Sequence, residues 1–395
     1  IAGYYMVGQH GMAAFARADG SGQQTLLHEY AHHHMFATTG RRHPAWYVEG
    51  FAEFFSTATF DAQHVYFGQA PPRVGRLLVQ GKADWSRLIT TNSLDLRGVD
   101  AAIFYARAWA LTHYLFRKDG MRERLQAYLT AIAAGQPGGD AFAAHVADPA
   151  TLERTVRAYL GSKEFSFSRM DRQPVPASAI RVRPLSPAAD AMLMMVVSLS
   201  PRGPAADDPA AALASVRAAA ARFPGDALAT RTLALAELHW GDKAAALALA
   251  EQALAAAPDD AELLRLKGQA LLAADRQANR GAARRVLAEA IKRDPADWRA
   301  MRLYVHTHDL VGSLVPDSLF NIIETMWSLA PQVDANAIDM AVALIRRDRL
   351  SDAAQVLEPL AYAPHGTRPR IRALHAAALA GDRAAIARAL AVPPP

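Results

Sequence analysis

The hydrophobic and polar positions of the chain change period several times, and each change marks a predicted element. Residues 4–17 alternate loosely between apolar and polar side chains, which predicts one or two strands. A helical period follows to about Thr38, and a second short helix is expected after Pro44. Residues 64–67 predict another short strand. The N-terminal part is therefore expected to mix helices with a little sheet.

Longer helical patterns follow. The segment from Asp100 to Lys118 predicts a strongly apolar helix, and residues 121–134 predict an amphipathic partner with alternating charge. A further helix is predicted over residues 149–161. Residues 162–205 hold several prolines and little helical period, so this segment is predicted to be a linker or crossover.

The second half of the chain is repetitive. Its prolines recur at intervals of 34, 37, 36 and 33 residues, at positions 224, 258, 295, 331 and 364. Such a period, with a proline closing each helix pair, is typical of tetratricopeptide repeats, in which helix pairs stack into a solenoid. Residues 299–328 fit the period poorly. An alanine-rich helical bundle without repeat geometry is the alternative that the pattern leaves open.

Composition narrows the function classes. The chain has 395 residues, of which 51% are hydrophobic and 21% charged, and its net charge is +5. Lys and Arg are scattered among acidic residues without a basic, aromatic-rich block, so nucleic-acid binding is not indicated. No apolar run reaches the roughly 18 residues that suggest a membrane span. The absence of cysteine excludes disulfides and cysteine zinc sites.

The most specific motif is HExxH, formed by His28-Glu29-Tyr30-Ala31-His32 inside a predicted helix. Residues four apart lie on one helical face, so both imidazoles can bind one Zn²⁺. Glu29 lies beside them and is placed to accept a proton from water. A polar helix face with unrelated histidines is the alternative interpretation.

A second motif follows at residues 45–53, Ala-Trp-Tyr-Val-Glu-Gly-Phe-Ala-Glu, with two carboxylates one helical turn apart. A catalytic zinc usually has three protein ligands and one open position, and Glu49, 17 positions after His32, is the predicted third ligand. Glu53 is then placed to accept a hydrogen bond from a ligand imidazole, which would fix the orientation of that ring.

HExxH followed by WxxEGxAE resembles the gluzincin metallopeptidases, the thermolysin and aminopeptidase N group. The closest resemblance is to peptidase MA-like bacterial proteins that also carry tetratricopeptide repeats. It implies that His28, His32 and Glu49 bind zinc and that Glu29 is the general base. It also implies a tyrosine on a later helix that stabilises the oxyanion, and Tyr105 has the matching context.

The resemblance has one departure. The G-x-M-E-N strand with which aminopeptidases hold a substrate amino terminus has no counterpart before His28, and the nearest strand-like segment is residues 10–16. Endopeptidase specificity is therefore expected rather than exopeptidase specificity. Packing in the core is the alternative role for Tyr105.

Together these patterns predict an α+β, mostly helical fold. A gluzincin-like metallopeptidase domain is expected over residues 1–161, a linker over 162–205, and TPR-like helical repeats over 206–395. Because the chain begins at Ile1 without an initiator Met or a signal segment, it is expected to be either processed or a fragment. N-terminal truncation is favoured, because the resemblance to gluzincins implies several strands before the HExxH helix and only one or two fit into residues 1–20. A periplasmic or exported location is favoured over a cytoplasmic one.

The predicted function is zinc-dependent hydrolysis of peptide bonds in a peptide or protein substrate, with the repeats binding that substrate or a protein partner. Two alternatives stay open. The chain could be a TPR interaction or scaffold protein whose metallopeptidase domain is weakly active or inactive. It could also be a zinc hydrolase that acts on another kind of bond.

Overall fold

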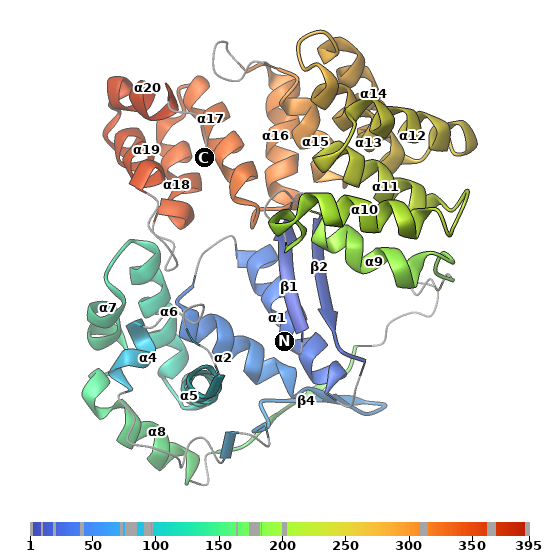
Figure 1. Cartoon of the computed structure of the whole chain (residues 1–395). Coiled ribbons are helices and arrows are strands. Elements are labelled where there is room, and N and C mark those ends of the chain that lie inside the picture. Colours follow the sequence, from blue (N-terminus) through green and yellow to red (C-terminus); the bar gives the residue numbers. More distant parts are fainter. Residues whose placement is uncertain are drawn as a thin grey trace. The chain divides into compact units, whose positions relative to one another are not determined.

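The structure is a computed structural model that describes residues 3–8, 11–18, 21–39, 43–71, 74–75, 85–90, 96, 98–162, 165–173, 182, 184–199, 204–308, 315–361 and 369–391. This part of the chain is mostly helical, with one two-stranded and one three-stranded sheet (Figure 1). The prediction of a mostly helical chain with a small amount of sheet is confirmed.

The strands are β1 (Gly3–Gly8), β2 (Gly11–Ala16), β3 (Thr59–Phe60), β4 (His64–Phe67) and β5 (Ser168–Asp171). The helices up to residue 160 are α1 (Gly22–Thr39), α2 (Ala45–Ser56), α4 (Ser86–Thr90), α5 (Gly98–Arg117), α6 (Met121–Ala133), α7 (Gly138–His145) and α8 (Leu152–Leu160). They are followed by α9 (Ala189–Ser198), α10 (Pro209–Ala220), α11 (Ala227–Trp240), α12 (Lys243–Ala256), α13 (Ala261–Ala274), α14 (Arg280–Arg293), α15 (Trp298–Val305), α16 (Asp317–Leu329), α17 (Asp334–Arg346), α18 (Leu350–Ala361), α19 (Pro369–Ala380) and α20 (Arg383–Ala391).

Contacts within the chain group it into two compact units. The first unit holds Ile1–Met6, Ala14–Val175 and Leu350–Pro395, and the second holds Val7–Ala13 and Pro176–Arg349. Domain boundaries after residues 161 and 205 stay a prediction, because residues 163–164, 174–181, 183 and 200–203 of the predicted linker lie outside the described residues.

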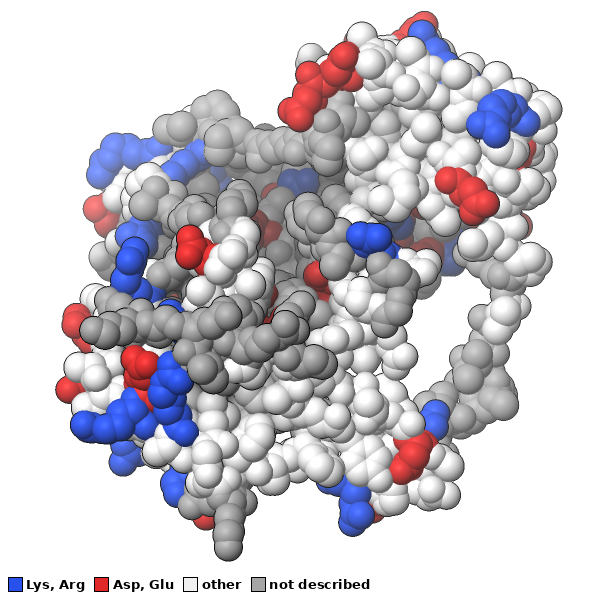
Figure 2. All heavy atoms as spheres, turned by 60° about the horizontal axis from the view of Figure 1, so that its bottom comes forward, with Lys and Arg blue, Asp and Glu red and all other residues white. Residues whose placement is uncertain are grey.

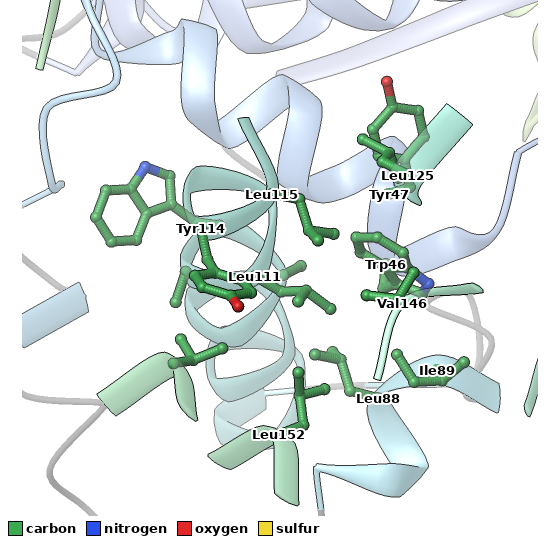
Figure 3. Close-up of a cluster of buried hydrophobic side chains, with 14 of the residues drawn as sticks. Trp46, Tyr47, Leu88, Ile89, Leu111, Tyr114, Leu115, Leu125, Val146 and Leu152 are labelled. Atoms are coloured by element: carbon green, nitrogen blue, oxygen red, sulfur yellow. The ribbon is translucent and has the colours of Figure 1, made fainter. Parts of the chain in front are cut away.

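The core of the first unit lies around α5. Helix α2 packs between α1 and α5 (Figure 1), and α6 and α8 also contact α5. Trp46, Leu111 and Leu115 are fully buried, and they point toward the same apolar centre in Figure 3. Nε1 of Trp46 donates a hydrogen bond of 3.2 Å to the Tyr128 hydroxyl, so the polar edge of this indole is satisfied inside the core. This core holds α2 in place.

The three-stranded sheet of the first unit contains one strand at its predicted position, β4, and two that were not predicted, β3 and β5. β4 forms over residues 64–67 as the sequence indicates and pairs antiparallel with β3. Its other edge pairs with β5, with His64 opposite Asp171 and Phe67 opposite Ser168. Residues 168–171 were assigned to a linker. Their alternation is too short to predict a strand, and they become one because β4 offers a free edge.

The second unit is built of consecutive helices that pack on their sequence neighbours from α10 to α17. The first helices of successive pairs begin at residues 227, 261, 298 and 334, so the intervals are 34, 37 and 36 residues. These intervals equal the proline spacings in the sequence. The predicted repeat of helix pairs is confirmed at the level of architecture. The Gly312-Ser313 region, where the repeat pattern fails, lies outside the described residues.

An aspartate begins each of the first three of these helix pairs. In the segments Pro-Gly-Asp, Pro-Asp-Asp and Pro-Ala-Asp, the last aspartate is the N-cap residue: Asp226, Asp260 and Asp297. Asp226 accepts a hydrogen bond from the backbone N–H of Leu228, and Asp260 accepts one from that of Leu263, at 2.9 and 3.0 Å. The proline ends one helix pair and the aspartate caps the next, which explains why the two residues recur together.

The same helices carry a ladder of arginines, each five positions after its N-cap. Nη1 of Arg231 lies 3.9 Å from the Asp260 carboxylate. Nε of Arg265 lies 3.2 Å from the Asp297 carboxylate, and Nε of Arg302 lies 3.2 Å from that of Asp339. Each arginine therefore reaches an aspartate on the first helix of the next pair, which fixes the register between neighbouring repeats. Alanine content alone would not produce this pattern.

Charged side chains of both signs share the surface. On the face drawn in Figure 2, basic and acidic side chains are interspersed. Several charged side chains of the described residues form ion pairs: Arg293 lies 2.8 Å from Asp259 and 2.7 Å from Glu289, and Lys267 lies 2.9 Å from Glu251. Within the described residues, no helix has the length and apolar character needed to cross a membrane.

Because of the arginine ladder, we expect the replacement of Arg265 to lower the free energy of unfolding by a large amount. Arg265 is 4% exposed and Asp297 is 5% exposed. Arg265→Ala therefore leaves the buried Asp297 carboxylate with one positive charge fewer beside it. We expect the apparent free energy of unfolding in urea to fall by roughly 3 kcal/mol, the lower end for breaking a buried ion pair, because Arg299 still contacts Asp297.

Arg293→Ala on α14 is the control, because its ion pairs are solvent-exposed. This variant should lower the free energy of unfolding by no more than about 1 kcal/mol. Equal losses in the two variants would show that the ladder does not set the stability of the repeats.

Candidate metal centre

Three side chains from two helices converge at one point of the first unit. His28 and His32 lie one turn apart on α1, and Glu49 lies on α2. The two Nε2 atoms of the histidines are 3.1 Å apart, and each lies 3.4 Å from Oε2 of Glu49. Among the described residues, this is the group whose ligand atoms are close enough together to hold a metal ion.

The size and chemistry of this triangle fit zinc. Tetrahedral zinc with nitrogen and oxygen ligands at about 2.0–2.1 Å holds those ligand atoms about 3.3–3.4 Å apart. The edges of 3.1, 3.4 and 3.4 Å are close to that separation. Two imidazoles and a carboxylate are also a known ligand set of catalytic zinc. These three electron-rich atoms repel one another unless a cation or a proton lies between them.

The electrostatics of the cluster keep Glu49 ionised. Burial alone would raise the pKa of Glu49, but hydrogen bonds with His28 and His32 and their charges lower it to about 2. The pKa of His28 is raised. Its burial acts in the opposite direction and is outweighed by Glu49, Glu53 and Glu29. Glu49 is therefore an anion at neutral pH, the state in which a carboxylate binds a metal.

The position of Glu49 depends on a close approach of α2 to α5 at Gly50. A Cβ atom on Gly50 would lie 2.4 Å from the Ala108 carbonyl oxygen and 2.1 Å from Oγ1 of Thr112. Both distances are shorter than real contacts, so a larger residue would have to push α2 away from α5. Because Glu49 directly precedes Gly50, this approach sets where the carboxylate meets the histidines.

Glu53 lies behind one of the two imidazoles. Its Oε1 is 3.5 Å from Nδ1 of His28, and the residue is 2% exposed. Nδ1 is the ring nitrogen that does not face Glu49, whose Oε2 lies 3.4 Å from Nε2. A proton held on Nδ1 toward Glu53 leaves the lone pair of Nε2 free for a metal, which is the arrangement usual around metal-bound histidines.

Glu29 and Tyr105 lie beside the cluster. The pKa of Glu29 is raised, mainly by burial, against the charges of His28 and His32 and a hydrogen bond from the Tyr5 main chain. The Tyr105 ring on α5 stands edge-on to the His28 ring, with 6.2 Å between the centroids and 81° between the planes. The structure thus brings every predicted site residue to this cluster, while their chemical roles stay a prediction.

Two residues that shape the site were not identified from the sequence. Gly50 stands inside the WxxEGxAE motif, and a glycine between a ligand and an apolar helix face was an available signal for close packing. Tyr5, whose main chain helps to set the pKa of Glu29, carried no signal, because the two residues are 24 positions apart in the sequence.

The comparisons with known proteins provide no information about the metal centre. No protein family matches the sequence, and no curated protein matches it. A crystal structure of a thermophilic TPR protein from Thermus thermophilus is similar to part of the fold, with 20% sequence identity and a TM-score of 0.39. The similarity covers 49% of this chain and 99% of that one.

The close approach at Gly50 predicts that Gly50→Ala weakens both the fold and the site. Alanine is a better helix former than glycine by about 1 kcal/mol, so an exposed helical site would gain stability. Here the added methyl group meets the Ala108 carbonyl oxygen. We expect the apparent free energy of unfolding to fall by about 1–3 kcal/mol and the zinc affinity, measured by competition with a chelator, to fall as α2 shifts.

Gly139→Ala on α7 is the matched control, because a Cβ atom at that helical glycine would meet nothing within 4 Å. It should leave the melting temperature equal or slightly higher. A Gly50→Ala chain as stable as this control, with wild-type zinc affinity, would show that the contact with α5 does not position Glu49.

Proposed function

We propose that the chain binds one zinc ion through His28, His32 and Glu49 and uses it to hydrolyse peptide bonds. The observation that carries the proposal is the triangle of two imidazole nitrogens and one carboxylate oxygen, with edges of 3.1 and 3.4 Å. Three protein ligands leave one position of a tetrahedral zinc open, as in catalytic rather than structural sites.

The residues around the triangle suit hydrolysis. Zinc, when bound, would supply a Lewis acid that polarises a carbonyl group and makes water more acidic. Glu29 would take the proton from the attacking water and pass it to the leaving amine. Tyr105, beside His28, would donate a hydrogen bond to the developing oxyanion. Peptide or protein substrates and endopeptidase specificity remain part of this proposal.

A second function, protein interaction through the helical repeats, has the broader support. Consecutive helix pairs with a spacing of 34, 37 and 36 residues make up the described part of the second unit. Stacked pairs of this kind present extended surfaces that commonly bind peptides or proteins. Hydrolysis rests on the metal centre alone, whereas an interaction role follows from the architecture of the repeats. The two functions are compatible, since the repeats could bind the substrate or a partner.

The zinc proposal predicts one equivalent of metal per chain. Purified protein should contain about one zinc, and His28→Ala or His32→Ala should abolish stoichiometric binding because each removes one of three ligands. Glu53→Gln should retain zinc with about 10-fold or more weaker affinity, since it alters only the contact behind His28. Metal analysis by mass spectrometry, with a chelator titration, measures both effects.

Arg154→Ala on α8 is a control for the metal assay, because this residue belongs to no part of the site. Zinc content that is the same in wild-type, His28→Ala and His32→Ala protein would exclude the metal centre. The interaction function would then stand by itself.

The hydrolytic role predicts a separation of metal binding from turnover. Glu29→Gln should keep zinc and lose nearly all cleavage, because an amide cannot act as the base. Tyr105→Phe should keep zinc and lower kcat by roughly 100-fold or more, the scale for removing one oxyanion donor. A proteome-derived peptide library analysed by mass spectrometry supplies the substrates.

The result of this assay separates the two functions. A chain that binds zinc but cleaves no peptide of the library would favour a partner-binding protein with an inactive centre. Wild-type turnover in Glu29→Gln would exclude Glu29 as the base and leave the zinc ligands unaffected.

A further inference from the structure

The two histidines of the candidate metal centre are held by different kinds of neighbour. Nδ1 of His28 faces the Glu53 carboxylate at 3.5 Å. Nδ1 of His32 is buried, and within the described part of the chain no group forms a hydrogen bond with it. A hydrogen bond at this nitrogen is the usual means by which a protein fixes the ring of a metal-bound histidine. The orientation of the His32 ring therefore has another source.

An aromatic ring lies flat against His32. Phe36 follows His32 by four positions on α1, so its side chain lies on the same helical face. The two ring centroids are 6.0 Å apart and the planes differ by 11°, which is the geometry of an offset stack. His28, one turn earlier, stands edge-on to His32, with 4.7 Å between the centroids and 88° between the planes. The imidazole of His32 thus has one parallel and one perpendicular ring as neighbours.

Phe36 is held by neighbours of its own. It is partly buried and packs against the apolar core of the first unit. The Tyr5 ring on β1 stacks on Phe36, with 6.3 Å between the centroids and 24° between the planes. The Tyr5 hydroxyl lies 3.1 Å from Nδ1 of His33, so the tyrosine is also held at its polar end. A phenyl ring constrained in this way offers His32 a fixed plane.

The plane of the His32 ring decides whether its nitrogen points at the metal position. Nε2 of His32 lies 3.1 Å from Nε2 of His28 and 3.4 Å from Oε2 of Glu49. The torsion that turns an imidazole ring has a broad energy profile, so the helix backbone alone does not select one plane. Turning the His32 ring out of the plane parallel to Phe36 carries Nε2 away from the other two ligand atoms.

We infer that Phe36 is a positioning residue for His32: by stacking, its ring fixes the orientation that Glu53 fixes in His28 by hydrogen bonding. The inference rests on the proposed zinc site for its effect on metal affinity, while the effect on the His32 ring is the same without metal. It requires a flat side chain at position 36, whereas a role in core packing alone requires only apolar volume.

The stack is tested in metal-free protein by nuclear magnetic resonance on the full chain with ¹³C-labelled histidine. The His32 ring signals are those that disappear in His32→Gln. The ring current of a phenyl group shifts the signals of protons close to its face, so the His32 ring signals should move in Phe36→Leu. Phe36→Tyr keeps the ring and should leave them in place. Unchanged His32 signals in Phe36→Leu would overturn the inference.

The effect on zinc is tested by competition with a chelator. Phe36→Leu keeps most of the apolar volume and loses the flat face. We expect its zinc affinity to fall about 10-fold, the lower end of the range for losing a group behind a metal ligand. Phe36→Tyr should bind zinc as tightly as the wild type. The visible spectrum of bound Co²⁺ depends on coordination geometry, so its bands should shift in Phe36→Leu and not in Phe36→Tyr.

Phe67→Leu on β4 is the matched control. Phe67 is also partly buried against the core of the first unit, and it stacks on Phe55 with 5.4 Å between the centroids and 29° between the planes. Its replacement should lower the melting temperature, as Phe36→Leu does, and leave zinc affinity and the Co²⁺ spectrum unchanged. An equal loss of zinc affinity in the two variants would show that Phe36 acts through packing alone and would overturn the inference.

The outcomes also separate this inference from the proposed function. A wild-type chain that binds no zinc would remove the proposed function, and the histidine signals of Phe36→Leu would still show whether Phe36 sets the His32 ring. Equal zinc affinity in wild-type and folded Phe36→Leu protein would exclude the positioning role and leave the zinc site standing. If Phe36→Leu does not fold, nuclear Overhauser contacts between the Phe36 and His32 ring protons of the wild type decide, and their absence would overturn the inference.

Discussion

The close approach of α2 to α5 at Gly50 is the constraint on which the metal centre depends. The Ala108 carbonyl oxygen and Oγ1 of Thr112 occupy the space that a Cβ atom would need, so the two helices meet backbone to backbone. Trp46, fully buried one turn earlier and hydrogen-bonded to Tyr128, prevents α2 from rotating. Because a well-packed interior has few alternative arrangements, the packing of α2 against α5 also fixes the position of Glu49.

The packing holds together a group of side chains that would not assemble unaided. Two imidazole nitrogens and a carboxylate oxygen lie within 3.4 Å of one another, and Glu53 adds a second buried carboxylate behind His28. Burying such groups opposes folding unless charges and hydrogen bonds compensate. The core around α5 supplies the stability that tolerates this cluster. A local arrangement unfavourable by itself and retained by its surroundings is typical of a functional site.

The stability of the second unit depends on the packing between neighbouring helix pairs. A pair of short helices cannot bury its apolar face alone, so each pair packs on the next. Stacking by apolar contacts alone would allow neighbouring pairs to slide. The aspartate caps and the arginines five positions later remove that freedom, because the contact of Arg265 with Asp297 forms in one register. The same aspartate both begins a helix and receives the arginine of the preceding pair, so capping and stacking reinforce each other.

Local patterns were sufficient for the sequence to determine part of this protein. The spacing of His28 and His32 placed both rings on one helical face, the recurring prolines gave the helix-pair period, and residues 64–67 gave β4. Each of these features depends on residues close together in the chain, where helix and strand periods act directly. The grouping of Glu49 with the two histidines was also expected, because a known motif links the segments.

The tertiary structure alone decided how those segments meet. β5 forms because β4 offers an edge more than a hundred positions away in the sequence, and nothing in residues 168–171 signals it. Gly50 meets α5, and the Tyr5 hydroxyl meets His33, through contacts whose partners no local period specifies. Such contacts depend on how whole elements pack, and packing is settled by the shapes of many distant side chains together rather than by the pattern of any single segment.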